Sequence, residues 1–315
     1  MSSVVNPFTG RWIMEPKTQN VWGNQHATWF TLMGIGGGLF INRLLFGIEL
    51  GRFWGMTWAD IISLALIGVG GLILIADLGK PLRVLRALLN PRTSWISIGA
   101  IADFTFMGLA GLWTLADLNF GGGGLNLTGL PWHGDGTLGL IFQVIAALAA
   151  IVVIAYPGLV LASSPSIPFW NSTLIPMQFL VNGFASGLAC GLIYAAIVPS
   201  DVSGDVLTGW LSLTTGLLVL SVFLQIAHVL NGQYTHVAAK VAVRRLLSGN
   251  LQVAYLGGVV LAGLVIPLAL IAYALSDSAG SNAAMAAGIA GVLILAGNWL
   301  SKHTVIRAGT YASLF

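Results

Sequence analysis

Cysteine is almost absent from this 315-residue chain, and charged residues are scarce. The one thiol, Cys190, excludes a disulfide framework, an iron–sulfur cluster or a cysteine-rich zinc site built from this chain alone, because each needs several ligands. Only 7% of the residues are charged, against about 25% in soluble domains, while 57% are hydrophobic. The composition therefore predicts an integral membrane protein, in contact with the lipid bilayer and without a nucleic-acid partner.

Long apolar runs make up most of the chain. A helix needs about 20 apolar residues to span the hydrocarbon core, and it satisfies all its backbone groups internally. We therefore predict an all-α integral membrane protein with eight transmembrane helices. The first 23 residues lack the apolar core of a secretory signal peptide, so the first span is expected to direct insertion. The expected spans are about 27–49, 58–76, 95–118, 137–162, 173–198, 206–230, 252–275 and 282–304.

The basic residues are distributed unevenly about these spans. An even number of spans places both termini on one side, and eleven of the thirteen Lys and Arg residues fall on that side. Arg52 lies on the opposite side, and Arg43 lies within the first span. The positive-inside rule then predicts that both termini and the basic connectors are cytoplasmic. A basic docking face for a partner protein would produce the same asymmetry.

One connector, residues 76–99, contains four of the thirteen basic residues. Its prolines, including the Asn90-Pro91 pair, interrupt a helix, so we expect it to lie along the membrane surface. It includes the runs DLGKP at 77–81 and LLNPRTSWIS at 88–97, and the run AYPGLVLASSPSIPFWNS follows at 155–172. The four basic residues are Lys80, Arg83, Arg86 and Arg92.

These three runs, together with GIGGG at 34–38, resemble the NrfD/PsrC family of membrane subunits found in polysulfide-reductase-like complexes. The resemblance covers nearly all of residues 20–230. It implies two four-helix bundles, with an interfacial segment at 1–26, a first bundle with a quinone pocket at 27–162, and a second bundle with a short tail at 163–315.

The resemblance also implies a function. The chain would anchor an oxidoreductase complex in a prokaryotic inner membrane and exchange electrons and protons with menaquinone or ubiquinone. It would not be catalytic on its own. The implied partners are a ferredoxin-like iron–sulfur subunit and a catalytic molybdopterin subunit, which would carry the iron–sulfur clusters and molybdopterin, and this chain would hold no haem or metal.

Candidate quinone contacts follow from the same resemblance. The family places a tyrosine at the YPG motif and polar groups at the start of the first helix against the quinone, which corresponds to Tyr156 and His26 here. Trp29 stands where a family member has a histidine, and it joins the candidate contacts. Asp77 could orient Tyr156 or His26, accept a proton, or pair with Lys80 or Arg83. An aromatic or histidine residue at a membrane boundary can also be purely interfacial.

Ionisable residues within the spans are costly and point to function. Asp103 lies eight residues into the third span, and we predict that it passes protons between the quinone pocket and the opposite side, with Arg43 and Glu49 further along. Arg43 is also near enough to its helix end to extend toward the interface. Lys80, Arg83, Arg86 and Arg92 could dock an acidic iron–sulfur subunit or could simply form a charged surface.

Two other functions fit parts of the sequence. A haem-b quinone oxidoreductase subunit needs axial histidine pairs on facing helices, and His26, His228 and His303 all lie near inner helix ends. A secondary transporter would contain repeats and broken helices, and Pro176 and Pro267 interrupt two spans. The sequence shows no convincing repeat, and a transporter leaves the basic connector unexplained.

Overall fold

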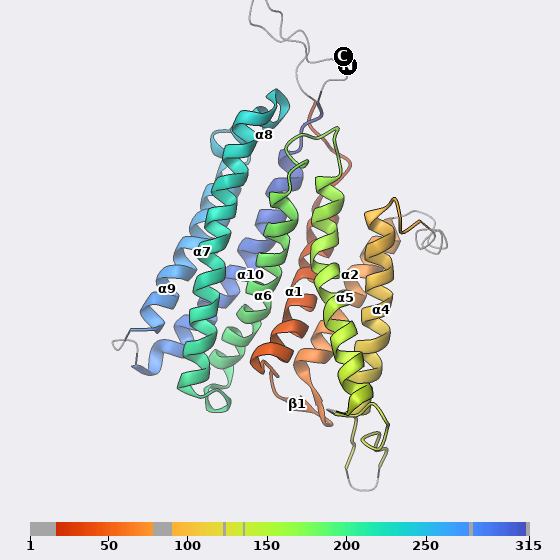
Figure 1. The fold of residues 1–315 in the computed structure, drawn as a ribbon. Helices are drawn as coiled ribbons and strands as arrows, with labels where there is room; N and C mark the ends of the chain where they lie inside the picture. The colour runs from red at the N-terminus through yellow and green to blue at the C-terminus, as the bar shows by residue number, and fades with distance from the viewer. Residues whose placement is uncertain (1–16, 78–89, 122–123, 135, 277–279, 313–315) are drawn as a thin grey trace, which may run out of the picture.

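The computed structural model describes residues 17–77, 90–121, 124–134, 136–276 and 280–312 (Figure 1). Within these ranges, eight helices are long and apolar enough to cross a membrane, which confirms the predicted all-α membrane fold. Each corresponds to one predicted span. They are α1 (Asn24–Phe46), α2 (Trp58–Asp77), α4 (Trp95–Ala116), α5 (Thr137–Ala162), α6 (Leu174–Ile197), α7 (Gly204–Thr235), the continuous segment η3 (Val253–Val265) plus α9 (Ile266–Ala274), and α10 (Ala283–Ala308).

Three spans differ in detail from the sequence prediction. The first helix begins at Asn24, so His26 lies inside it, and it ends at Phe46. Gly47 caps it with a left-handed φ of 67°, which few other residues adopt easily. Helix α7 continues to Thr235, beyond the apolar stretch expected to end near residue 230. The seventh span begins as a π-helix, η3, before it becomes α-helical in α9. The lengths of the apolar runs predicted where the spans lie, but they did not predict these local details of helix geometry.

Helix α1 lies in the middle of the arrangement, in contact with α2, α5, α6 and α10 (Figure 1). On one side of it, α4 packs on α5, and on the other side α6 packs on α7 and α10. η3 and α9 complete that second side through contacts with α10. The division into two four-helix bundles, with limits at residues 26 and 162, stays a prediction.

Glycines allow α1 and α6 to approach closely. A Cβ atom on Gly38 would overlap the carbonyl oxygen of Gly183, and a Cβ atom on Gly187 would overlap the backbone of Gly38. Small residues are common at such contacts because membrane helices gain stability mainly from close backbone approach. The backbones of α1 and α6 are therefore in direct contact.

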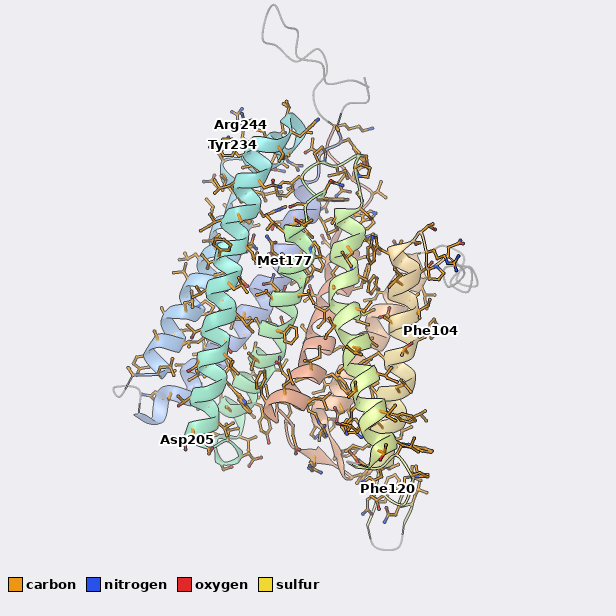
Figure 2. The ribbon with its side chains drawn as sticks, in the orientation of Figure 1. Phe104, Phe120, Met177, Asp205, Tyr234 and Arg244 are labelled. Atoms are coloured by element: carbon orange, nitrogen blue, oxygen red, sulfur yellow. The ribbon has the colours of Figure 1, made fainter. Side chains whose placement is uncertain are left out.

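The two ends of the molecule carry different short elements. At what we call the hairpin face, β1 (Arg52–Phe53) pairs antiparallel with β2 (Met56–Thr57). The described ends of the polypeptide meet at the opposite end, the terminal face, where Thr18 pairs with Thr310. The helix α8 (Val237–Leu247) also lies at the terminal face, as do Tyr234 and Arg244, whereas Asp205 and Phe120 mark the hairpin face (Figure 2). Two further short helices in the described ranges are η2 (Pro199–Asp201) and η4 (Gly280–Asn282).

Candidate functional site

Tyr156 and Asp103 form a hydrogen-bonded pair between α5 and α4. The tyrosine side chain is fully buried, and its hydroxyl donates to Asp103 Oδ2 at 3.2 Å. Gly99, one turn before Asp103, makes room for the aromatic ring, because a Cβ atom there would overlap it. The sequence pointed to the two polar residues separately, and helix packing brings them together.

Asp103 also lines an apolar cleft of about 550 Å³ between α2 and α4. Leu72 and Phe104 line the same cleft and are more than half exposed, so in a membrane they face lipid. The second carboxylate oxygen of Asp103, Oδ1, is buried and has no hydrogen-bond partner among the described residues. The cleft therefore combines apolar walls, an opening toward lipid and an unused polar atom, which are the usual components of a site for an apolar ligand with a polar head.

His26 and Asp77 form a second pair nearer the terminal face. Their Nε2 and Oδ2 atoms lie 3.2 Å apart, and the imidazole stacks on Trp22 with ring centroids 4.7 Å apart. Asp77 also lines an open cleft of about 760 Å³, together with residues from the first turns of α1. Of the alternatives considered for Asp77, this contact favours the orientation of His26, while Lys80 and Arg83 lie outside the described residues.

Trp29 lies between these two pairs. It is one turn beyond His26 on α1, and its ring centroid lies 5.9 Å from that of Tyr156. Its indole nitrogen is buried without a hydrogen-bond partner in the described part of the protein. The four candidate quinone contacts thus lie on α1, α2 and α5, toward the terminal face. They are His26, Trp29, Asp77 and Tyr156. Their contact with a quinone stays a prediction.

The residues of the predicted proton path have partners of their own. Arg43 Nε lies 3.3 Å from Asp60 Oδ2, and its guanidinium carbon lies 4.3 Å from the ring centre of Trp113. Glu49 instead binds Arg52 through two hydrogen bonds of 2.9 and 3.0 Å. The described contacts do not join Asp103, Arg43 and Glu49 into one hydrogen-bonded network, and their role as a path stays a prediction.

Asp60 is a buried acid that the sequence analysis did not select as a site residue. Its side chain is fully buried and accepts a hydrogen bond from the Thr57 hydroxyl. The signal that could have found it is Arg43, since a cation inside a membrane usually has a partner. Asp60 and Arg43 form a buried ion pair near the hairpin face.

Charges outside the membrane also cluster at the hairpin face. His133 Nε2 lies 3.3 Å from Asp117 Oδ1. Burial raises the pKa of Asp117, and the nearby His133, Arg43 and Arg52 charges oppose this shift. The hydrogen bond to Glu49 raises the pKa of Arg52 further above its usual value. The carboxyl of Asp117 is thus easier to protonate than an exposed aspartate.

The predicted docking surface is only partly described. Arg92 is exposed in the turn before α4, and Ser94 caps that helix by accepting a hydrogen bond from the Ser97 backbone at 3.4 Å. The other three docking candidates, Lys80, Arg83 and Arg86, lie outside the described residues. Their docking role stays a prediction.

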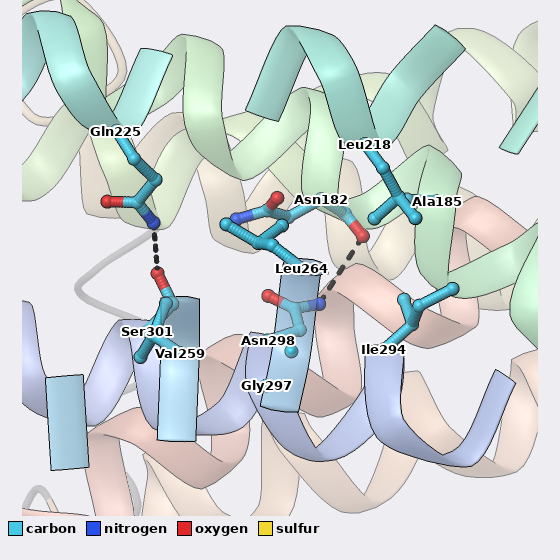
Figure 3. A pocket seen from close by; sticks show the side chains of 11 residues that line it. Asn182, Ala185, Leu218, Gln225, Val259, Leu264, Ile294, Gly297, Asn298 and Ser301 are labelled. Atoms are coloured by element: carbon cyan, nitrogen blue, oxygen red, sulfur yellow. Dashed lines mark hydrogen bonds between the residues drawn. The ribbon is translucent and has the colours of Figure 1, made fainter. Parts of the chain in front are cut away.

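A second polar region lies between α6, α7 and α10 (Figure 3). Asn298 donates to Ser186 at 2.6 Å, and Gln225 donates to Ser301 at 2.9 Å. Lys302 is buried beside this region and donates to Asn298 Oδ1 at 2.8 Å. Lys302 was counted among the eleven basic residues on the side of the termini, but its side chain is buried between helices, so it is not an exposed charge of the terminal face. Its position within the expected span at 282–304 was the overlooked signal.

The histidines and acids of the described residues do not gather into a metal-binding cluster. These residues contain no group of three or more His, Cys, Asp or Glu side chains that could hold a metal ion. The three histidines considered as haem ligands each have a different neighbour. His26 pairs with Asp77, His228 lies against Phe169, and His303 stacks on Trp299.

Eight apolar helices and a tyrosine–aspartate pair beside a lipid-facing cleft define a multi-pass membrane protein. The sequence profile described as "Polysulphide reductase, NrfD" matches residues 12–312. The protein therefore belongs to the NrfD family, as the sequence motifs predicted.

Three relatives illustrate the membership. The C subunit of polysulfide reductase from Wolinella succinogenes is 24% identical over 265 residues, covering 79% of this protein and 82% of the relative. Protein NrfD of Escherichia coli is 26% identical over 196 residues, covering 56% and 60% of the two proteins. The C subunit of anaerobic dimethyl sulfoxide reductase from Haemophilus influenzae is 29% identical over 139 residues, which is 44% of each protein.

Proposed function

We propose that this protein is the membrane anchor and quinone-reacting subunit of a multisubunit oxidoreductase. Two of its relatives are each named as one lettered component of a reductase, which supports a place in a complex of several subunits. The observation that carries the quinone assignment is the Tyr156–Asp103 pair beside a lipid-facing apolar cleft. Menaquinone or ubiquinone would be its membrane substrate.

The cleft suits a quinone for physical reasons. A quinone is an apolar molecule that moves within the bilayer, so an opening lined by Leu72 and Phe104 gives it a route from lipid. Its two carbonyl oxygens need donors, and the Tyr156 hydroxyl would donate to one of them when Asp103 is protonated and donates to the tyrosine oxygen instead of accepting from it. Trp29 and Met107 add flat or adaptable apolar surface nearby.

Tyr156 and Asp103 would each have a role in proton exchange with the quinone. Conversion between quinone and quinol moves two electrons and two protons. In quinol oxidation, Tyr156 would orient the hydroxyl that loses its proton and Asp103 would accept that proton. The reverse reaction would use the same atoms in the opposite order. The His26–Asp77 pair is the second group on this side of the fold that can hold or pass a proton.

The electrons would pass to or from an iron–sulfur partner at the terminal face. Arg92 is exposed there, and the connector adds further basic residues, so the complementary surface would be acidic. A ferredoxin-like subunit and a catalytic molybdopterin subunit would complete the complex. With the positive-inside rule, this face would be cytoplasmic in a prokaryotic inner membrane.

The test is a Tyr156→Phe variant in the intact complex. We expect quinone-linked turnover to fall by roughly a hundredfold, because the hydroxyl that positions the proton is lost. Activity of the catalytic subunit with an artificial soluble electron carrier should not change. Tyr255→Phe is the matched control, since Tyr255 is also buried but donates to Gln225 in the other half of the fold. Equal loss of both activities in Tyr156→Phe would contradict the assignment.

A further inference from the structure

Helix α7 is longer than the hydrocarbon core of a bilayer is thick. This helix has 32 residues, or about 48 Å at 1.5 Å per residue, while the hydrocarbon core is about 30 Å thick. At least one end must therefore extend beyond the core. At the terminal face α7 passes directly into α8, whose first turn is capped by the His236 imidazole accepting from the Ala238 backbone at 3.0 Å. The backbone thus turns between the two helices at the terminal face.

Helix α8 has two different faces. One face is buried against the protein and consists of Ala238, Ala239, Ala242, Val243 and Leu246. The other face is exposed and presents Lys240 and Arg244, which are four residues apart and so project from the same side. Val237 and Leu247 are exposed beside them. This face therefore offers two cations flanked by apolar side chains.

Arg245, the third basic residue of α8, holds this helix against the end of α10. Arg245 donates to the Arg307 carbonyl at 2.9 Å, which ties α8 to the end of α10, and also to Asn250 at 3.3 Å. By contrast, none of the ion pairs found among the described residues includes Lys240 or Arg244. Both cations are thus exposed and have no acidic partner in the described part of the protein.

An open groove of about 790 Å³ runs beside these two residues. Gln233, at the end of α7, and Ser248, just beyond α8, add an amide and a hydroxyl to its walls. Tyr234 and Arg244 mark this corner of the molecule, at the opposite end from Asp205 (Figure 2). The groove is lined by Gln233, Val237, Lys240, Val241, Arg244 and Leu247, among others.

We propose that this groove binds an anionic glycerophospholipid. The phosphate would lie between Lys240 and Arg244, the polar glycerol region against Gln233 and Ser248, and an acyl tail along Val237 and Leu247. Basic residues at a membrane surface attract anionic headgroups, and apolar side chains at the same depth hold the acyl tail. An acidic protein surface matches the charge of this groove, but it leaves the exposed valine and leucine without a partner.

The experiment uses the full-length protein in an uncharged detergent. Bound lipid is counted by native mass spectrometry while palmitoyl-oleoyl phosphatidylglycerol or the phosphatidylcholine with the same acyl tails is added. We expect a saturable site for the anionic lipid that the zwitterionic lipid does not fill. Lys240→Gln and Arg244→Gln should each weaken binding by roughly fivefold, and the double variant by roughly thirtyfold.

The control removes the same charge elsewhere on the terminal face. Lys17→Gln/Arg92→Gln changes two other exposed cations, and it should bind the anionic lipid as the wild type does. Equal lipid binding by Lys240→Gln/Arg244→Gln and the wild type would overturn the proposal. Displacement of the lipid by an equal concentration of inorganic phosphate would also overturn the proposal, because it would indicate a simple anion site. Loss of a partner subunit from the Lys240→Gln/Arg244→Gln complex, with lipid binding intact, would overturn it in favour of protein docking.

Discussion

The hydrogen bond between Tyr156 and Asp103 is the contact on which the proposed quinone chemistry depends. Tyr156 was selected from a motif and Asp103 from its unusual place in an apolar run, and the structure joins them by a hydrogen bond beside the cleft that Asp103 lines. Their hydrogen bond could not be predicted, because it depends on how closely α4 and α5 approach. Asp60 was missed for the same reason, since its pairing with Arg43 joins two helices.

Gly99 gives a test of the Tyr156 position that leaves the tyrosine unchanged. In Gly99→Ala the new methyl group would overlap the Tyr156 ring, so the ring must move away from Asp103. We expect quinone-linked turnover of the complex to fall roughly tenfold or more, because a small displacement of a positioned group is costly. Gly108→Ala lies on the same helix with open space around it, and it should keep full turnover. Full turnover in Gly99→Ala would show that the Tyr156 position is unimportant.

The raised pKa of Asp117 predicts that the stability of the folded protein depends on pH. Burial raises its pKa above the ordinary value of 3.8, so ionisation of this carboxyl opposes folding. The stability that the protonated form contributes is complete below pH 3.8 and is lost as the pH rises through the folded-state pKa. Asp117→Asn cannot ionise, so its Tm in detergent should exceed that of the wild type at pH 7, and the difference should shrink toward pH 4.

Thermal denaturation followed by circular dichroism at both pH values measures this difference. Asp205→Asn serves as the control, because Asp205 is an exposed residue at the start of α7 on the same face. A Tm difference for Asp117→Asn that is the same at pH 7 and pH 4 would contradict the explanation.

At the scale of elements, apolar length predicted all eight spans but not their contacts. A membrane helix is recognised from about 20 apolar residues whatever its neighbours are, so the spans at 58–77 and 137–162 were found almost to the residue. The π-helical geometry of η3, which packs against α10, left no clear mark in the apolar pattern. Among the glycines of α1, Gly38 lies at the close contact with α6.

The contact between α1 and α6 can be tested at Gly38. Gly38→Ala would place a methyl group on the Gly183 carbonyl, so the helices must separate. We expect a loss of about 2 to 3 kcal/mol, or roughly 5 °C in Tm, measured by thermal denaturation in detergent. Gly216→Ala on α7 has open space around it and should leave Tm unchanged or slightly higher. Similar Tm values for the two variants would mean that close approach at Gly38 adds little stability.

For the whole molecule, the distribution of charge predicts the orientation in the membrane. The described residues include six cations at the terminal face, namely Lys17, Arg92, Lys240, Arg244, Arg245 and Arg307, while Arg52 is at the hairpin face. Lys302 is buried and does not count toward the exposed charge of the terminal face, but the asymmetry between the two faces remains without it. The sequence could predict the asymmetry because it needs only the order of spans and loops. It could not separate a topology signal from a docking surface, since both require exposed basic residues on one face.

Cysteine labelling in whole cells separates these two explanations. Cys190→Ser provides a cysteine-free protein, to which one exposed cysteine is added at either end. Asn250→Cys lies between α8 and η3 at the terminal face, and Gly129→Cys lies in the loop between α4 and α5 at the hairpin face. We expect a membrane-impermeant maleimide to label Gly129→Cys in intact cells and Asn250→Cys only after lysis, as the positive-inside rule requires. The reverse pattern would place the basic face outside the cytoplasm. The charge asymmetry would then have to come from the partner that docks there, and the iron–sulfur subunit would be expected on that outer side.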